Sequence, residues 1–183
     1  MFVGCYLRCD VQSFEAFSFY RGVSNRYSSS AVSIITPRRD RQPRDSSVNF
    51  HNIADEWFFD RFGFRYRSGG VFVTSRILTA TAYASTPAHV VRVLPLSSYS
   101  YCWSKNVSDL LFMEKEVGSQ SREVIRRRLH MADYQVDELA SAHVLGNEVM
   151  LNCEVYAAIP TAILPKANGE GPIGSASIIL LGN

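Results

Sequence analysis

The sequence lacks long hydrophobic runs, and no stretch approaches the roughly 18 apolar residues that cross a membrane. Residues 1–9 have no basic region ahead of their apolar residues, so we expect no signal peptide, no membrane partner and a cytoplasmic location. Glycine-rich phosphate loops are missing as well, since neither Gly-x-Gly-x-x-Gly nor a Walker-type motif occurs. A nucleotide would therefore have to be bound by other means.

Cysteine and histidine are sparse, with four of each in the chain. Cys5 and Cys9 stand four apart, but no second close pair follows them, so the spacing of a zinc finger is absent. The histidines are scattered and lack the spacing of metal ligands on one helix. We expect reduced thiols and no metal site.

Aromatic and apolar residues are plentiful, with 11 Phe, 9 Tyr, 2 Trp and a hydrophobic fraction of 46% among 183 residues. A chain of this length and composition can bury a sizeable core without disulfides. We expect a single globular domain over residues 1–183.

The net charge of +2 is small, but the arginines are clustered. One group lies within residues 38–44 and a second within residues 122–128: Arg38, Arg39, Arg41 and Arg44, then Arg122, Arg126, Arg127 and Arg128. Such groups suit a polyanion or a phosphate-bearing ligand. A solvated loop and a solvated helix face explain them equally well. Asp109 and Glu114 are interpreted as surface charges of a helix.

Strand-like and helix-like segments alternate without the regular rhythm of a doubly wound sheet, which predicts an α+β fold. Expected strands are 14–23, 32–36, 70–75, 89–94, 148–159 and 176–181, with a flexible loop over 169–177. Expected helices are 49–62 with Gly63 as its C-cap, 76–85, 109–115, 122–130 and 134–145 stopped by Gly146. Residues 97–104 are polar and aromatic, and residues 1–13 are left unassigned.

Three polar spots stand at the ends of these apolar segments, where a rigid strand can hold a functional side chain. The first is Tyr20-Arg21-Gly22, in which the planar guanidinium suits phosphate oxygens and the glycine would admit a ligand to the backbone. The second is Thr74-Ser75 after the strand containing Phe72, where hydroxyls commonly cap a helix. The third is Glu148, which opens a strand directly after a glycine turn.

The order of these spots resembles the mono-ADP-ribosyltransferases, in the arginine-serine-glutamate branch that includes many bacterial toxins. The segments FYRGVS at 19–24, GVFVTSRILTATAYA at 70–84, HVVRVLP at 89–95 and GNEVML at 146–151 are similar to that family. The resemblance spans roughly residues 19–159. It implies a split mixed β-sheet core with flanking helices, and NAD as co-substrate.

The resemblance also implies the roles of individual residues. Arg21 would hold the phosphates and nicotinamide ribose of NAD, Ser75 with Thr74 would orient Glu148, and Glu148 would stabilise the oxocarbenium-like species as nicotinamide leaves. Preorganised charge at a developing cation is an effective form of catalysis. Aromatic rings that could pack on the bound rings are Tyr20, Phe72 and Tyr83.

The sequence departs from the family pattern in two places. Val73 stands where a first serine is common, and Gly146 stands where arginine-modifying members have Glu or Gln. The second departure puts protein-arginine modification in doubt and favours RNA or DNA as acceptor. Glu154 offers a competing register for the catalytic glutamate, but the turn before Glu148 favours Glu148.

Several functions remain open at this point. A protein acceptor or simple NAD hydrolysis would use the same site, whereas a non-enzymatic nucleic-acid-binding module would use the two arginine groups. If the chain is a toxin or effector, the resemblance implies an antitoxin or immunity protein as partner.

Overall fold

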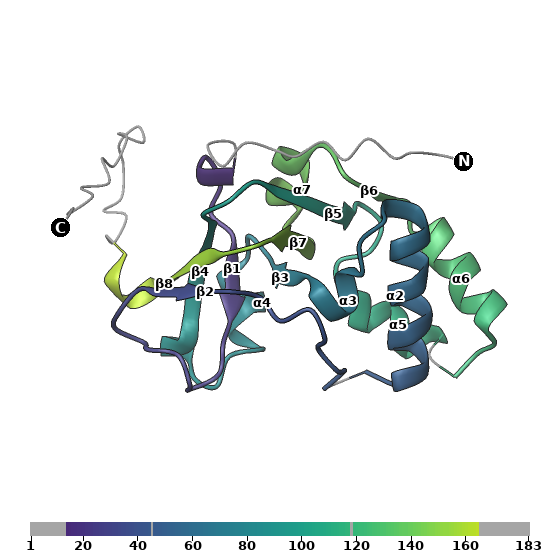
Figure 1. Ribbon diagram of the computed structural model, residues 1–183, viewed down its shortest axis with the longest axis horizontal. Coiled ribbons are helices and arrows are strands. Elements are labelled where there is room, and N and C mark those ends of the chain that lie inside the picture. The colour runs from purple at the N-terminus through teal and green to yellow at the C-terminus, as the bar shows by residue number, and fades with distance from the viewer. Residues whose placement is uncertain (1–13, 45, 118, 165–183) are drawn as a thin grey trace.

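The computed structural model describes residues 14–44, 46–117 and 119–164, which form an α+β fold (Figure 1). The expected strand at 176–181, the loop at 169–177, residues 1–13 and both Cys5 and Cys9 lie outside the described residues. The strands are β1 Tyr20–Gly22, β2 Ser33–Ile35, β3 Val71–Val73, β4 Val90–Pro95, β5 Tyr99–Ser104, β6 Tyr134–Gln135, β7 Val149–Cys153 and β8 Tyr156–Pro160. The helices are α2 Val48–Phe62, α3 Tyr66–Gly69, α4 Ile77–Thr81, α5 Leu110–Val117, α6 Arg122–Met131 and α7 Leu139–Leu145, with short 3-10 turns at Pro87–His89 and Thr161–Ile163.

The strands form two four-stranded sheets, with the orders β1-β4-β8-β2 and β3-β7-β5-β6. Every neighbouring pair in these sheets is antiparallel, so the expected mixture of strand directions is wrong for the described residues.

The two sheets meet where β1 passes β3. The backbone of Tyr20 donates to the carbonyl of Thr74 at 2.7 Å, and the backbone of Thr74 donates to the carbonyl of Tyr20 at 2.9 Å. This single bridge places Arg21 and Ser75 beside the junction of the sheets.

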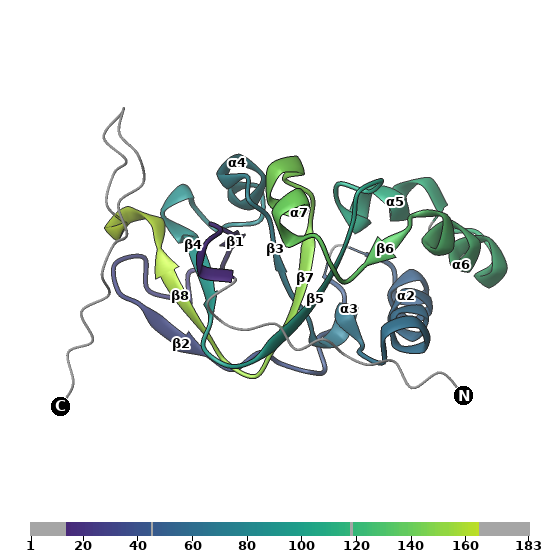
Figure 2. The ribbon, with the colours of Figure 1, turned by 90° about the horizontal axis from the view of Figure 1, so that it is seen from above.

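Alternation along the central strands separates two apolar cores. Inward-facing residues of both sheets build the first core together with α7, notably Val71, Val73, Val91, Val93, Tyr101, Trp103, Val149 and Leu151. Residues on the opposite face of the second sheet build the other core with α2, α3, α5 and α6, notably Phe50, Trp57, Phe58, Tyr66, Cys102, Leu129 and Met150. The molecule is thus layered as sheet, sheet and helices (Figure 2). Because β3 and β7 are covered on both faces, their sequences are continuous apolar runs.

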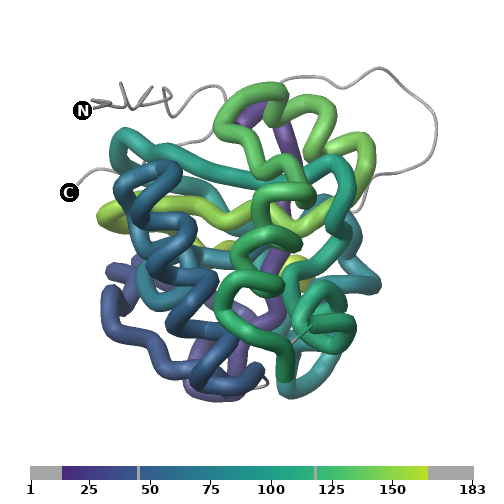
Figure 3. The backbone as a smooth tube through the Cα atoms, turned by 90° about the vertical axis from the view of Figure 1, so that its right-hand side faces the viewer, coloured from purple at the N-terminus to yellow at the C-terminus, as the bar shows by residue number. Residues whose placement is uncertain are grey.

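Helix α2 illustrates how closely local sequence can specify an element. The hydroxyl of Ser47 accepts from the backbone of Phe50, and Gly63 ends the helix with φ of 64°, in the left-handed region that glycine tolerates. Its aromatic face packs in the second core beside α6, and the two helices run side by side (Figure 3). The expected helix at 49–62 and its C-cap are confirmed.

Other segments differ from expectation. The strand expected over 14–23 is confined to Tyr20–Gly22, and the helix expected over 76–85 is only Ile77–Thr81. Residues 134–145 begin as strand β6 before α7, residues 97–104 contain strand β5, and the long strand over 148–159 is divided into β7 and β8. The division falls at Glu154, whose backbone donates to Ser97 Oγ at 3.2 Å. Tertiary pairing overrides local pattern in each case.

No helix in the described part of the chain combines the length and apolarity needed to cross a membrane. Cys102 and Cys153 are free and buried.

Candidate functional site

Glu148 lies between the end of α7 and the start of β7, with its carboxyl group turned toward α5. Its backbone donates to the carbonyl of Ser108 at 2.8 Å, and its Oε1 accepts from the backbone of Leu110 at 3.3 Å. The side chain is partly buried on the face of the sheet that α2 and α5 cover. The first turn of α5 therefore fixes the direction of this carboxyl group.

The residues before Glu148 are anchored on both sides. Gly146 ends α7 with φ of 71°, and the hydroxyl of Thr74 donates to its carbonyl at 2.9 Å. Asn147 is 9% exposed and donates to the carbonyl of Ser104 at 2.9 Å. This turn holds Glu148 rigidly, as a preorganised site requires.

Ser75 has a different partner from the one expected. Its hydroxyl donates to the carbonyl of His143 at 2.6 Å, and Arg76 donates to the carbonyl of Leu145 at 2.7 Å. With Thr74 these residues satisfy three carbonyls at the C-terminal end of α7, which intrahelical bonds leave unpaired. Ser75 thus supports the helix that precedes Glu148 and does not hydrogen-bond the Glu148 carboxylate in this structure.

Arg21 projects from β1 and donates to the carbonyl of Phe72 at 3.2 Å. Tyr20, next to it, joins the two sheets through its backbone. A Cβ atom on Gly22 would meet the carbonyl oxygen of Ala80 at 2.3 Å and the backbone of Ala84 at 2.5 Å. Gly22 is therefore required for the close approach of α4 to β1, and α4 fills the space where a ligand was expected.

Phe72 is the centre of an arginine cluster, defined here as Arg21, Arg41 and Arg67. The guanidinium carbon of Arg41 lies 4.8 Å from the Phe72 ring centroid, and that of Arg67 lies 5.4 Å from it. Arg41 also donates to the carbonyl of Gly70 at 2.5 Å. The Nε atoms of both Arg41 and Arg67 are buried and have no hydrogen-bond partner in the structure. Buried donors without a protein partner are uncommon, and water, an ion or a ligand usually satisfies them.

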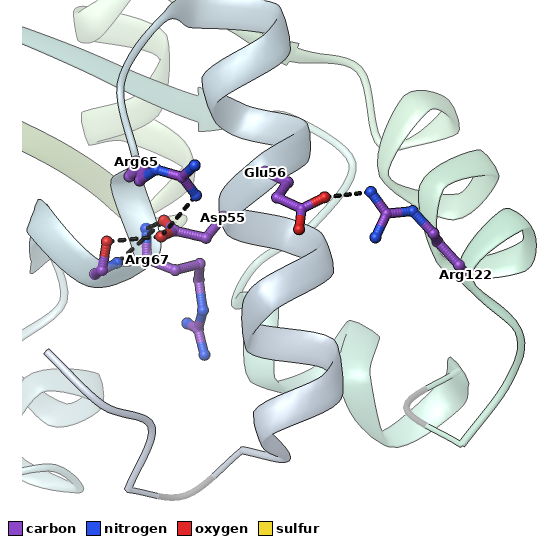
Figure 4. A network of polar contacts seen from close by, with 6 residues as sticks. Asp55, Glu56, Arg65, Arg67 and Arg122 are labelled. Carbon is purple, nitrogen blue, oxygen red and sulfur yellow. Dashed lines mark hydrogen bonds and ion pairs between the residues drawn. The ribbon is translucent and has the colours of Figure 1, made fainter. Parts of the chain in front are cut away.

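The backbone of Arg67 is held from the side opposite its guanidinium. Asp55, which is 4% exposed, accepts from the backbone of Arg67 at 2.9 Å and from the hydroxyl of Ser68 at 2.6 Å. Figure 4 shows the Arg67 side chain pointing away from this carboxylate. Asp55 therefore positions Arg67 without pairing with its charge.

Electrostatics separate these groups from ordinary surface charges. Burial, reinforced by the charge of Asp109, raises the pKa of Glu148 to about 8, although Arg67 and Arg41 oppose the rise. Burial and the charges of Arg21 and Arg67 lower the pKa of Arg41 to about 10. Arg21 and Glu148 therefore belong to one electrostatic assembly, linked through Arg41, and perturbed groups of this kind favour a functional site.

Two members of the assembly, Arg67 and Asp109, escaped the sequence analysis as functional candidates. Arg41 belonged to the first arginine group, for which a phosphate-bearing ligand and a solvated loop were equally good explanations, and Arg67 has no sequence pattern that distinguishes it. Asp109 was interpreted as a surface charge, yet it is 6% exposed and accepts from the phenol of Tyr83 at 2.5 Å. Glu114 is similarly buried, at 8% exposed, and accepts from the backbone of Ser47. The one available signal was the position of Asp109 directly before α5, because Asp commonly caps the N-terminus of a helix.

Glu154 lies at the other end of β7, in the turn before β8, and is exposed. Beside it is a surface pocket of about 340 Å³, lined by Arg39, Gly63, Phe64, Ser98, Tyr99, Ser100, Asn152, Cys153 and Glu154. Arg39 crosses this pocket, donating to Asn152 Oδ1 at 2.8 Å and to the carbonyl of Cys153 at 2.9 Å. Its guanidinium is thus used to join β7 to the loop before α2.

The second arginine group packs helices together. Arg122 pairs with Glu56, as Figure 4 shows, while Arg126 lies 2.8 Å from Asp60 and Arg128 lies 2.8 Å from Glu116. In the first group, Arg38 pairs with Asp40. These ion pairs give four of the eight clustered arginines a structural explanation, and they weaken the argument from clustering to a nucleic-acid partner.

Comparison of the chain with protein-family models, with curated proteins and with solved structures finds no match. Among residues 14–44, 46–117 and 119–164, no group of three or more His, Cys, Asp or Glu side chains is arranged to hold a metal ion.

Proposed function

We propose that the chain is an NAD-dependent mono-ADP-ribosyltransferase that breaks the glycosidic bond of NAD beside Glu148 and transfers ADP-ribose to a macromolecule. The observation on which this proposal depends is the joint presence of a partly buried carboxyl group and the arginine cluster around Phe72. NAD presents a cationic nicotinamide ring at one position and an anionic pyrophosphate at another. A site with both signs of charge matches that distribution.

The arginine cluster supports the binding of a pyrophosphate. Three guanidinium groups share a partly buried region with few carboxylates, and the Nε atoms of Arg41 and Arg67 have no partner. Phosphate oxygens would accept from these donors and would relieve the repulsion among the three cations. Phe72 would meanwhile present its edge or face to a bound ring.

Glu148 would act on the ribose. When the bond between the ribose carbon and the nicotinamide nitrogen breaks, both electrons leave with nicotinamide and positive charge develops on the sugar. An ionised Glu148 stabilises that charge, and the fixed arginines hold the pyrophosphate in place. A nucleophilic atom of the acceptor then bonds to the ribose carbon and loses its proton to solvent.

The surroundings of Gly146 favour an acceptor other than a protein arginine. A Cβ atom there would meet the Arg76 side chain at 2.2 to 2.7 Å, and the backbone has φ of 71°. Glu or Gln at position 146 would therefore be strained and crowded. We propose RNA or DNA as the acceptor, with a protein as the alternative and water as the acceptor in simple NAD hydrolysis.

The test compares Glu148→Gln with Glu154→Gln, which makes the same change at the other end of β7. Purified proteins are incubated with NAD labelled in its adenylate and with a cell lysate, and free nicotinamide is quantified. We expect Glu148→Gln to reduce nicotinamide release by about 10²-fold or more, and Glu154→Gln to leave it unchanged. Equal release from wild type and Glu148→Gln, or none from wild type, would refute the proposal.

The same incubation identifies the acceptor. Aliquots are digested with protease or nuclease before the labelled macromolecules are separated by size. Label removed by nuclease alone indicates a nucleic-acid acceptor, and label removed by protease alone indicates a protein. Nicotinamide release without any labelled macromolecule indicates NAD hydrolysis.

A further inference from the structure

Two carboxyl groups share the first turn of α5. The Oδ1 atom of Asp109 accepts from the backbone of Leu111 at 2.7 Å, and Oε1 of Glu148 accepts from the backbone of Leu110 at 3.3 Å. Consecutive backbone donors at the start of one helix thus serve side chains that come from different parts of the chain. These donors favour negative charge there, but two adjacent carboxylates repel each other.

Tyr83 fixes Asp109 from the other side. Its phenol, which follows α4, donates to Oδ2 of Asp109 at 2.5 Å. Both oxygens of Asp109 therefore have donors, and the residue is only 6% exposed. Tyr83 was one of three aromatic residues that could pack on a bound ring, and in the structure its hydroxyl group is directed to this carboxylate.

We propose that Asp109, held by the phenol of Tyr83, is a positioning residue for Glu148, and that its negative charge beside the first turn of α5 keeps Glu148 protonated in the free protein. This inference rests on the proposed function, in which Glu148 must be ionised to stabilise the developing cation. Asp109 determines the pH at which that ionised form becomes available. Substrate binding adds a cationic ring beside Glu148, which favours loss of the proton to solvent.

The charges around Glu148 agree with this arrangement. After burial, Asp109 is the largest contributor to the raised pKa of Glu148. Arg67 on α3 and Arg41 in the loop before α2 oppose it. Glu148 also lies near the buried Cys102 on β5 and Tyr134 on β6, and its charge contributes to the raised pKa of each. Asp109 is therefore the like charge whose removal should most change the protonation of Glu148.

The decisive experiment titrates the Glu148 carboxyl carbon by NMR in full-length protein labelled with 13C at glutamate. Asp109→Asn keeps an oxygen to accept from Leu111 and turns an NH2 group toward the Tyr83 hydroxyl, which can accept from it. Because the charge is removed, the Glu148 midpoint should fall by about one pH unit or more. Glu114→Gln is the matched control, because Glu114 is a buried carboxyl on the same helix whose charge is not among the main contributors to the Glu148 shift. That control should leave the midpoint in place.

Tyr83→Phe provides a second variant should Asp109→Asn fail to fold. Loss of the phenol leaves Oδ2 of Asp109 without its donor and frees this carboxyl group to move away from Glu148, so the Glu148 midpoint falls by a smaller amount. The pH at which kcat/KM for nicotinamide release reaches half its maximum should fall in parallel in both variants.

An unchanged Glu148 midpoint in both variants would overturn the inference, as would an equal shift in Glu114→Gln. The NMR titration needs no turnover, so the two proposals can fail separately. A shifted midpoint in a protein that releases no nicotinamide would support the Asp109–Glu148 pair and refute the transferase.

Discussion

The two ends of β7 place two glutamates in opposite surroundings, separated by about 20 Å of extended chain. At one end Glu148 is partly buried, accepts from the first turn of α5, and has the arginine cluster and Asp109 as neighbours. At the other end Glu154 is exposed beside a pocket whose arginine, Arg39, is occupied with an amide and a carbonyl. The surface pocket therefore lies beside the exposed Glu154. The buried Nε donors without partners belong to Arg41 and Arg67, near Glu148.

This contrast shows which property distinguishes the candidate sites. A surface pocket whose arginine already has hydrogen-bond partners offers space, but it exerts little selective force on a charged ligand. Buried Nε donors that lack partners, such as those of Arg41 and Arg67, present an energetic cost that an anion would remove. In this protein, buried charged groups with unpaired donors indicate a functional site better than a surface pocket does.

The largest expected effect that separates the two ends is the pH dependence of stability. The pKa of Glu148 rises from about 4.3 in an unfolded chain to about 8 in the folded protein. The stabilisation that the protonated Glu148 gives the folded state is therefore fully present below the pKa of the unfolded chain. It is lost as the pH rises through the pKa of the folded protein. Relative to wild type, Glu148→Gln should gain roughly 2 kcal/mol of unfolding free energy between about pH 6 and about pH 8.

Urea denaturation of both proteins across this pH range measures the difference, because other titrating groups cancel in it. Glu154→Gln serves as the comparison, and the difference between it and wild type should stay flat because its side chain is exposed. A pH-independent difference for Glu148→Gln would mean that Glu148 is as well solvated as Glu154.

An intermediate effect should follow from breaking the support of the Glu148 end. Thr74 is 7% exposed, and its hydroxyl donates to Gly146 and accepts from the backbone of Arg76. Thr74→Val conserves shape but leaves two backbone groups without a partner, which should cost about 1–3 kcal/mol. Denaturant unfolding measures this cost.

Thr81→Val is the control for that substitution, since the Thr81 hydroxyl is exposed and bonds only within α4. Its cost should stay within about 0.5 kcal/mol. Equal costs for the two variants would show that the turn before Glu148 does not depend on the β3 hydroxyl.

Elements with strong local determinants were predictable from the sequence. The apolar spacing of α2, its serine N-cap and its glycine C-cap lie within one short segment, and so do the continuous apolar runs of β3 and β7. The placement of Ser75 just after β3 and of Glu148 just before β7 also followed from such local patterns, whereas Arg21, expected near the end of a long strand, is the middle residue of β1. The roles of all three residues stay predictions.

Relationships between distant segments were not predictable. Ser75 bonds to α7 and not to Glu148, because α7 ends with carbonyls that β3 can satisfy. Arg41 and Arg67 come together only because Phe72 stands between the loop before α2 and α3. Asp109 is buried because Tyr83, 26 residues earlier, meets it across the fold. No spacing pattern in the sequence predicts these contacts between distant segments.

The smallest expected effect lies at the Glu154 end. Asn152 accepts from Arg39 at 2.8 Å and donates to Ser100 at 3.1 Å, at a position that water reaches. Asn152→Ala should cost about 1 kcal/mol or less, because water can replace its partners. Nicotinamide release should be unchanged, since this residue lies at the end of β7 remote from Glu148.

Denaturation and the nicotinamide assay together test this last prediction, with Ser100→Ala as the matched variant that removes one partner of Asn152. Both variants should fold with near wild-type stability and activity. A tenfold loss of nicotinamide release in Asn152→Ala, without a loss of stability, would mean that the pocket beside Glu154 takes part in the reaction. The contrast between the two ends of β7 would then be one of role within a single extended site, because a ligand would have to reach both.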